Sequence, residues 1–320
     1  MEECKKSRPI VKVIGIGNGG SNIVNRMYDR GIHGMSFALC DTDRQALCKS
    51  PVEARVFLEQ KTCGKPNAGN IPEITGAITE KDRENIGRLF NDGTRMAFII
   101  AGMGGATGTR AVPVITRMCR DMGILTVGIL TTPLLCEGHE RIIPALDGIG
   151  RTAGNVDALL VVNSEHFMGG NITPAGSNTF TKINDMIMAM IKDITDIITI
   201  PGHISLDFSD VKTILKDGGI TIISSGYGEG ENRMEDAIVN ALHSPLLNNN
   251  DVSRAKKILF NIYSSEEAPL IIEEMDAVAN FMKRLSHDTE FIWGTAIDEK
   301  LDGKVKMTML ATGFKISDVL

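Results

Sequence analysis

The chain has 320 residues, of which 42% are hydrophobic and 23% charged, and its formal net charge is −6. This composition is ordinary for a globular protein, and the length predicts two domains rather than one core. The acidic balance argues against a generic binder of nucleic acid or anionic membranes. No apolar run reaches the roughly 18 residues of a membrane span, and the first residues lack the apolar stretch of a signal peptide. We therefore expect a cytoplasmic protein without direct membrane insertion.

Short apolar runs alternate with helical patterns in the first half of the chain. Strands are predicted at 10–17, 35–43, 95–105, 124–132 and 157–164. Helices are predicted at 21–31, 110–123 and 138–154, with Pro113 tolerable only near the start of the second. The strands are apolar throughout, as strands covered on both faces are. This alternation predicts a doubly wound parallel sheet with helices on both faces.

The second half predicts a long helix followed by a smaller α+β domain. Apolar residues recur at the helical period over 177–198, and Pro201 and Gly202 end the helix. Strands follow at 220–228, 256–264, 290–298 and 304–314, with helices near 207–216, 232–243 and 273–285. The consecutive strands near the end indicate a mixed or antiparallel sheet. The predicted fold class is therefore α/β, with a parallel domain, a long central helix and a second domain with a mixed sheet.

The cysteines carry no metal or disulfide signal. They form no C-x-x-C pair and no cluster of histidines accompanies them, so reduced thiols and no metal ligands are expected. They are Cys4, Cys40, Cys48, Cys63, Cys119 and Cys136.

Two glycine-rich segments stand between a strand and a helix. The first, GIGNGGSN at 15–22, fits G-x-G-x-x-G, and Asp41 ends the next strand where a dinucleotide enzyme places its ribose-binding acid. An NAD-dependent oxidoreductase is thus one hypothesis. The second, GMGGATGT at 102–109, is unexplained by that hypothesis. Neither segment has P-loop spacing. Two helix N-termini directed at one place suit a ligand with several phosphates.

The quoted segments resemble a known family. GGATGT is similar to the GGGTGTG signature of the tubulin superfamily, and the chain from Val11 to Phe314 resembles FtsZ, the bacterial cell-division tubulin homologue. DTDRQAL resembles the family's NTDxQAL, TTPLLCEGHER its P-F-x-F-E-G-x-x-R, and LDFSDVKTIL the loop with N-x-D-x-x-D. SSGYGEGENRMEDAIVNALHSPLL, IWGTAIDE and MTMLATGF extend the resemblance.

The resemblance implies a GTP-binding domain at 1–176, a central helix at 177–200 and, at 201–320, a C-terminal domain that completes the neighbouring subunit's GTPase site. It implies GTP or GDP as ligand with Mg²⁺, head-to-tail homopolymers, a cytokinetic ring at the division site and membrane-anchor proteins as partners. The anchors would require a C-terminal peptide beyond residue 320.

The resemblance also assigns residues. The diphosphate would meet Gly19, Gly20, Ser21 and Asn22. The β and γ phosphates would meet Gly104, Gly105, Thr107, Gly108 and Thr109, with Asp41, Ala106 and Arg110 in the same site. Glu137 and Arg141 would hold the ribose and phosphate end, and Phe180 would stack on guanine beside Asn184.

Asp207 and Asp210 have two interpretations. Their spacing of three at a helix start places both on one face, and aspartate at such a position ordinarily caps the helix. The resemblance instead implies that these acids position and polarise the attacking water in the neighbour's site. Phosphoryl transfer needs mostly positioning and charge stabilisation, so two placed carboxylates with a metal suffice.

Several residues depart from the family pattern. Ala106 replaces a glycine, and a positive φ there would cost about 1–2 kcal/mol. Arg110 and Lys65 place cations where glycines are usual, which either tightens a polyphosphate or obstructs it. Asn67 replaces another glycine, and Ser164 and Ser205 each replace an asparagine. The alternative hypothesis is accordingly a scaffold paralogue with weak or absent hydrolysis.

Overall fold

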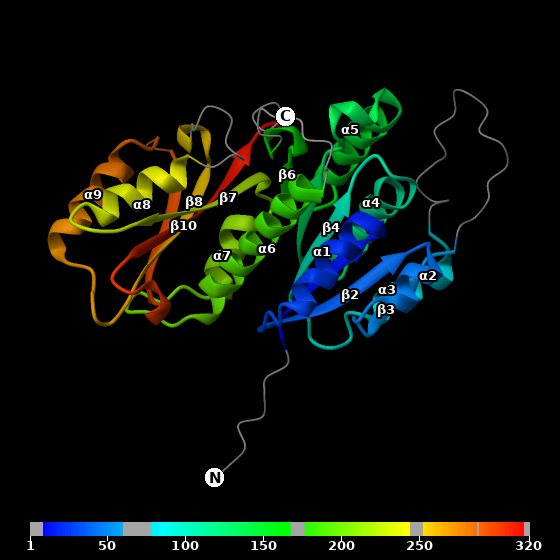
Figure 1. The fold of residues 1–320 in the computed structure, drawn as a ribbon, viewed down its shortest axis with the longest axis horizontal. Coiled ribbons are helices and arrows are strands. Elements are labelled where there is room, and N and C mark those ends of the chain that lie inside the picture. Colours follow the sequence, from blue (N-terminus) through cyan, green and yellow to red (C-terminus); the bar gives the residue numbers. More distant parts are fainter. Residues whose placement is uncertain (1–8, 60–77, 168–176, 244–251, 287, 317–320) are drawn as a thin grey trace, which may run out of the picture. The chain divides into compact units, whose positions relative to one another are not determined.

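The computed structural model describes residues 9–59, 78–167, 177–243, 252–286 and 288–316. The chain divides into two compact units, Met1–Val156 and Asp157–Leu320. Each unit carries its own set of strands and helices (Figure 1).

The first unit is built on a parallel sheet in the order β3-β2-β1-β4-β5. Its strands are β1 (Val11–Ile16), β2 (Met35–Asp41), β3 (Ala54–Phe57), β4 (Met96–Gly102) and β5 (Leu125–Thr131). Its helices are α1 (Gly17–Asp29), α2 (Arg44–Lys49), α3 (Glu80–Arg88), α4 (Ala106–Asp121) and α5 (His139–Ala153). The chain winds from β1 outward to β3 and then returns to β4, so the strand order reverses between β1 and β4, where ligands of such sheets bind.

Apolar side chains of β1, β4 and β5 make the core of this unit. All six residues of β1 and the first six of β4 and β5 are buried. α1 packs on β1, β2 and β4, and α4 packs on β4 and β5 (Figure 1). Continuous apolar strands of this kind are typical of a parallel sheet covered by helices.

Both glycine-bearing helices begin earlier than predicted. α1 begins at Gly17 rather than residue 21, and α4 begins at Ala106 rather than residue 110. Because glycine has a low helix propensity, the glycine-rich residues before 21 and 110 were predicted to lie outside the helices. Tertiary packing overrides this propensity, because a Cβ at Gly20 would lie 2.2 Å from the carbonyl oxygen of Ile100. Pro113 consequently lies in the interior of α4, contrary to the prediction that it lies near the start.

The second unit has a mixed sheet in the order β6-β7-β10-β8-β9. β10 is antiparallel to β7 and β8, whereas β6–β7 and β8–β9 are parallel pairs. Its strands are β6 (Ala158–Val162), β7 (Gly219–Gly228), β8 (Lys257–Ser264), β9 (Glu290–Ile297) and β10 (Val305–Phe314). Its helices are α6 (Ser177–Thr199), α7 (Phe208–Leu215), α8 (Arg233–Leu242) and α9 (Ile272–Lys283). The predicted fold class, a parallel α/β part followed by a long helix and a mixed sheet, is confirmed.

A buried ion pair fastens α6 to the sheet of the second unit. Lys306 Nζ on β10 lies 2.5 Å from Asp193 Oδ1 on α6, and both side chains are nearly inaccessible. Ser225 of β7 donates a hydrogen bond of 2.6 Å to the other oxygen of Asp193. The burial of Lys306 opposes its charge, but the Asp193 carboxylate outweighs this and raises the pKa of Lys306. Lys306 therefore stays charged at neutral pH.

Candidate nucleotide-binding site

The starts of α1 and α4 lie at the carboxyl ends of two adjacent strands. β1 and β4 pair in parallel, with Ile16 opposite Ala101, and each helix follows its strand closely. The N-cap residues Ile16 and Gly105 make no side-chain capping bond, and neither helix has an acidic residue in its first turn. The first N–H groups of a helix have no partner within the helix. Two such helix starts therefore favour an anion at this edge of the sheet.

Close contacts hold the two helix starts together. A Cβ at Gly17 would lie 3.4 Å from Thr107 Cβ, and one at Gly19 would lie 3.3 Å from the backbone nitrogen of Gly102. Thr42, which follows β2, hydrogen-bonds Thr107 through the two hydroxyls at 2.9 Å. The sequence reasoning missed Thr42, although its place directly after Asp41 in the DTD segment is a usable signal.

The glycines differ in whether the fold itself requires them. A Cβ at Gly108 would lie 2.6 Å from the carbonyl oxygen of Gly102, and Gly104 has φ +90 with the Arg141 carbonyl oxygen 2.8 Å from such a Cβ. These positions need glycine for backbone packing. Gly105 has φ −87, and no atom lies within 4 Å of its Cβ position. Packing does not explain this glycine, which leaves the N-terminus of α4 open.

Two buried polar atoms near the helix starts lack partners. Ser21 Oγ on α1 and Asp41 Oδ2 at the end of β2 have no hydrogen-bond partner in the described part of the chain. Their residues are 6% and 3% exposed. Buried polar atoms are nearly always hydrogen-bonded, so such exceptions indicate a missing ligand or ion. Burial, and then the charge of Asp41, raise the pKa of the neighbouring Cys40 thiol to about 12.

Glu137, in the short turn before α5, and Arg141, in the first turn of α5, lie near the same loop. Arg141 donates a bond of 2.6 Å to Glu137 Oε2, while Glu137 Oε1 accepts from the backbone N–H of Leu134 at 3.0 Å. The Arg141 carbonyl oxygen would lie 2.8 Å from a Cβ at Gly104, so the start of α5 lies beside the loop that precedes α4. Arg141 is 61% exposed on its side chain and remains accessible to a ligand.

Ala106 and Arg110 are the residues of α4 that depart from the family pattern. Ala106 is exposed at the first helical position, and among the described residues only Asp217 and Asp302 are non-glycine residues with positive φ. Ala106 therefore has no positive φ, and the backbone strain of about 1–2 kcal/mol considered above does not arise. Arg110 is exposed, and no described residue pairs with it. Lys65 and Asn67 lie outside the described residues. Ser164 is buried, and Ser205 donates a bond of 2.7 Å to the Gly202 carbonyl.

The other predicted site residues belong to the second unit. Phe180 and Asn184 lie four residues apart on α6, which is one helical turn, and Phe180 is 49% exposed. Such a large exposed aromatic face is available for stacking on a base.

Asp207 and Asp210 form a reciprocal capping box at the start of α7. Asp207 Oδ1 accepts from the backbone N–H groups of Ser209 at 2.6 Å and Asp210 at 3.2 Å. Asp210 Oδ2 accepts from the N–H of Asp207 at 2.8 Å. Each carboxylate therefore uses one oxygen for the cap and keeps the other. Capping and catalysis, which the sequence offered as alternatives, are compatible.

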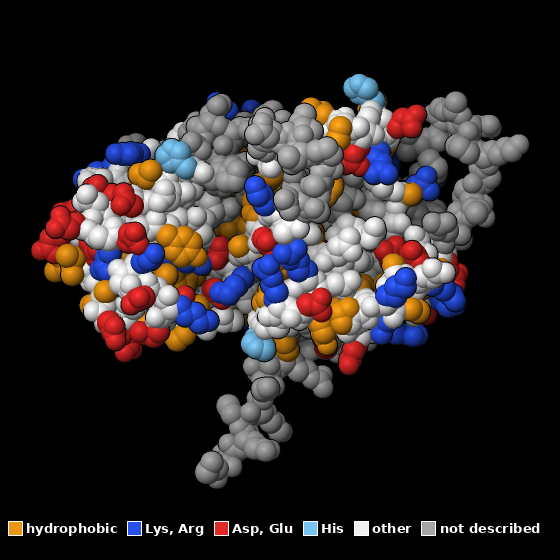
Figure 2. Space-filling model, viewed as in Figure 1, with side chains coloured by type: hydrophobic (Ala, Val, Ile, Leu, Met, Phe, Trp, Pro, Cys, Tyr) orange, Lys and Arg blue, Asp and Glu red, His pale blue; other side chains and the backbone are white. Residues whose placement is uncertain are grey.

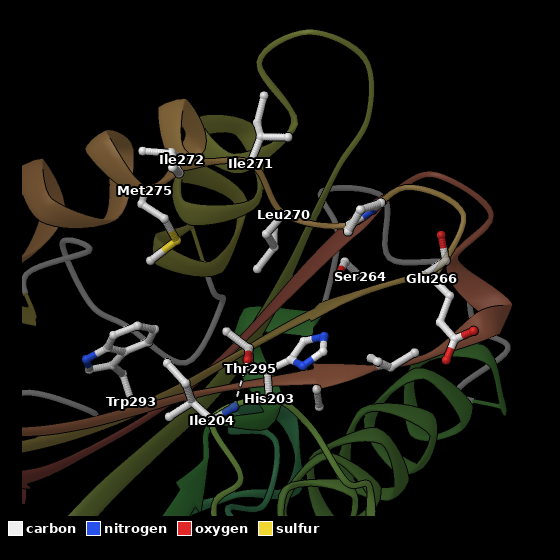
Figure 3. A pocket seen from close by; sticks show the side chains of 14 residues that line it. His203, Ile204, Ser264, Glu266, Leu270, Ile271, Ile272, Met275, Trp293 and Thr295 are labelled. Carbon is white, nitrogen blue, oxygen red and sulfur yellow. Dashed lines mark hydrogen bonds between the residues drawn. The ribbon is translucent and has the colours of Figure 1, made fainter.

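A separate cavity of about 520 Å³ lies in the second unit between β9, the start of α9 and the segment before α7 (Figure 3). Ile204 and Thr295 lie side by side there, with the N–H of Ile204 donating to Thr295 Oγ1 at 3.2 Å. Trp293 and the apolar Leu270, Ile271 and Met275 line it as well. None of the predicted nucleotide residues lines this cavity.

Two further observations concern metals and membranes. Among the described residues, no group of three or more His, Cys, Asp or Glu side chains is arranged to hold a metal ion. The same stretch of chain contains no helix with the length and apolarity needed to cross a membrane.

The chain is similar to known proteins along most of its length. The family model "Tubulin/FtsZ family, GTPase domain" matches residues 10–171, and "FtsZ family, C-terminal domain" matches residues 219–315. The "Cell division protein FtsZ" of Porphyromonas gingivalis is 46% identical over 308 residues, which cover 96% of this chain and 67% of the relative. The protein of the same name from Wigglesworthia glossinidia brevipalpis is 36% identical, covering 96% of this chain and 80% of that relative.

A solved structure gives the same likeness in three dimensions. The empty FtsZ dimer of M. jannaschii superposes with a TM-score of 0.79 at 30% identity. The superposition covers 97% of this chain and 89% of the M. jannaschii chain. The likeness therefore extends over both units.

Proposed function

The chain belongs to the tubulin/FtsZ family, and from this premise we propose that it binds GTP, polymerises head to tail and hydrolyses GTP where subunits meet, in the service of cell division. One observation carries the proposal on this chain's own residues. Two uncapped helix starts, α1 and α4, converge at the strand-order reversal, with the buried Ser21 hydroxyl unsatisfied beside them. A NAD-dependent oxidoreductase is set aside, because the family membership accounts for the second glycine segment and the C-terminal half as well.

We assign the nucleotide's phosphates to the two helix starts. The first turn of α1, from Gly19 to Asn22, would hold the diphosphate, and residues 104–109 would hold the β and γ phosphates through backbone N–H groups. Glu137 and Arg141 would meet the ribose and the phosphate end, since the backbone of Arg141 lies against Gly104 and its guanidinium pairs with Glu137. Phe180 and Asn184 would bind guanine. In this scheme residues 1–176 bind nucleotide, 177–200 form the central helix, and 201–320 serve the next subunit.

The hydrolytic step would use residues from two subunits. The oxygens of Asp207 and Asp210 that the capping box leaves free would orient and polarise the attacking water at a neighbour's γ-phosphate. A bound Mg²⁺ would neutralise charge on the phosphate oxygens.

Charge supports a head-to-tail contact. Basic residues outnumber acidic ones in the first unit, and acidic residues outnumber basic ones in the second. On the face shown in Figure 2, acidic side chains gather over α8 and α9. Opposite charge on the two units favours a heterologous contact, which extends into open filaments. Such filaments would form a ring at the division site with the help of membrane-anchor proteins.

The deciding experiment is GTP turnover measured against protein concentration, with Asp210→Ala measured alongside. We expect turnover per subunit to rise above a threshold concentration and to vanish in the variant while GTP binding persists. This result would mean that subunits complete one another's sites. Turnover that is absent at every concentration, with GTP still bound, would contradict hydrolysis and favour the scaffold hypothesis raised by Ala106, Arg110 and Ser205.

A further inference from the structure

Asp41 is a buried carboxylate with one oxygen that the protein does not satisfy. The residue is 3% exposed. Its Oδ1 accepts from the backbone N–H of Thr42 at 2.7 Å and of Asp43 at 3.2 Å. Its Oδ2 has no hydrogen-bond partner, and no described cation forms an ion pair with it. A buried carboxylate is costly unless a positive charge compensates it, so this arrangement favours a cation from outside the described chain.

The position of Asp41 identifies where that cation would lie. The last register pair between β1 and β2 joins Ile16 to Cys40, so Asp41 stands level with Gly17, the first residue of α1. The next residue, Thr42, hydrogen-bonds Thr107 in the first turn of α4. Asp41 therefore lies beside both helix starts to which we assign the phosphates.

A bare carboxylate at this place would oppose nucleotide binding, since it would repel a polyphosphate. A divalent cation between the two reverses the sign of the interaction. Mg²⁺ is bound by oxygen ligands, usually one or two carboxylates together with substrate phosphates rather than an all-protein cage. The absence of a larger acidic cluster among the described residues agrees with that mode.

We propose that Asp41 Oδ2 is this protein's own contribution to a Mg²⁺ site shared with the nucleotide's phosphates, so that Asp41 couples GTP affinity to the cation. This inference rests on the proposed function, because the phosphates complete the site. The inference goes beyond the proposed function because it names the residue through which the cation acts.

The test compares GTP affinity with excess Mg²⁺ and with EDTA, by calorimetry, in the wild type and in Asp41→Asn. The asparagine keeps the shape and the Oδ1 acceptor while removing the charge. We expect removal of Mg²⁺ to weaken GTP binding in the wild type about tenfold more than in the variant, within the usual range for coupled ligands. Without Mg²⁺, Asp41→Asn should bind GTP more tightly than the wild type, because the repulsion is gone.

Asp43→Asn is the matched control. Asp43 lies two residues away, but its carboxylate accepts from the N–H groups of Gln45 and Ala46 at 2.8 and 3.2 Å and caps α2. It should keep the wild-type dependence on Mg²⁺. Equal Mg²⁺ dependence in the wild type and Asp41→Asn would overturn the inference, whereas failure of the wild type to bind GTP under any condition would overturn the proposed function instead.

A second measurement uses the wild type alone and does not depend on the folding of a variant. Mn²⁺ replaces Mg²⁺ on protein labelled with ¹³C at the aspartate carboxyl groups. We expect GTP and Mn²⁺ together to broaden the Asp41 carboxyl signal beyond detection, and Mn²⁺ without GTP to leave it visible. A signal that survives with both present would overturn the inference.

Discussion

The helix starts of α4 and α7 differ in whether side chains of the protein cap the backbone N–H groups of the first turn. α7 is closed by its own side chains, since Asp207 and Asp210 occupy each other's backbone N–H groups. α4 begins after Gly105 with no side-chain cap and no acidic residue in its first turn. A helix start with a capping box presents carboxylate charge, whereas an open start presents N–H groups and positive partial charge.

The contrast teaches which helix starts can serve a ligand. An aspartate cap stabilises a helix by about 1 kcal/mol relative to alanine but by only a few tenths relative to glycine, so α4, with Gly105 at its N-cap, forgoes a few tenths of a kcal/mol. Such a sacrifice is expected where binding needs the N–H groups free. In a head-to-tail contact, an open start on one subunit and a carboxylate-bearing start on the next would be complementary.

The largest effect should follow from removing the charge of α7 while keeping its cap. In Asp210→Asn the side-chain oxygen can still accept from the N–H of Asp207, as the carboxylate does at 2.8 Å. We expect turnover to fall about 10³-fold, in the range typical of a lost acid or base, with GTP affinity unchanged. Single-turnover and binding assays measure the two quantities. Ser209→Ala, on the same helix, is the control, and turnover within twofold of wild type in Asp210→Asn would leave the acids with capping alone.

Substitutions at two glycines test whether packing requires glycine at each of the two helix starts. A Cβ at Gly20 of α1 would lie 2.2 Å from the Ile100 carbonyl oxygen, so Gly20→Ala should lower the free energy of unfolding by about 3 kcal/mol. Gly105→Ala meets no atom within 4 Å, so its cost should be limited to the poorer N-cap, about 0.5 to 1 kcal/mol. Urea unfolding without nucleotide measures both, and similar losses in the two variants would contradict the distinction.

The sequence predicted the fold well where long periodic or strongly apolar segments carry it. The 23-residue α6 and the buried strands β1, β4 and β5 were found because their patterns are long or uniform. The short α2 and β3 were not, since six and four residues are too few to show a period. The polar α3 was missed too, because only Asp82 and Ile86 of its nine residues are buried.

The candidate site was only partly predictable. The two glycine segments and the pair Asp207 and Asp210 can be recognised as sequence motifs. The starts of α1 and α4 were nevertheless predicted too late, because glycine indicates a loop unless the packing is known. The unsatisfied oxygen of Asp41 and the hydroxyl pair of Thr42 and Thr107 depend on contacts between distant segments. No pattern along the chain reports such contacts.

Arg110 tests whether the open start of α4 recruits extra positive charge. Helical side chains lean toward the N-terminus, so the long side chain of Arg110 can reach toward the open first turn. We expect Arg110→Ala to weaken GTP binding about tenfold, the value of roughly one charge-assisted hydrogen bond, and the difference to shrink at high salt.

Arg117 is the matched control for Arg110 on the same helix. It lies two turns further along, and its Nε is 3.8 Å from Asp121 Oδ2. Arg117→Ala should leave GTP affinity unchanged. Tighter binding in Arg110→Ala would mean instead that the arginine obstructs the phosphate, which is the other outcome that the sequence left open.

The smallest effect should come from closing α4 as α7 is closed. Gly105 has the extended φ and ψ of an N-cap, −87 and 156, and open space at its Cβ, so Gly105→Ser can cap the helix without strain. We expect the free energy of unfolding without nucleotide to rise by a few tenths of a kcal/mol, because serine caps slightly better than glycine. GTP affinity should fall a few-fold, because the serine hydroxyl competes for the N–H groups that the phosphate needs. Urea unfolding and calorimetry on one preparation measure both, and a variant that gains stability without losing affinity would show that the phosphate does not bind at this helix start.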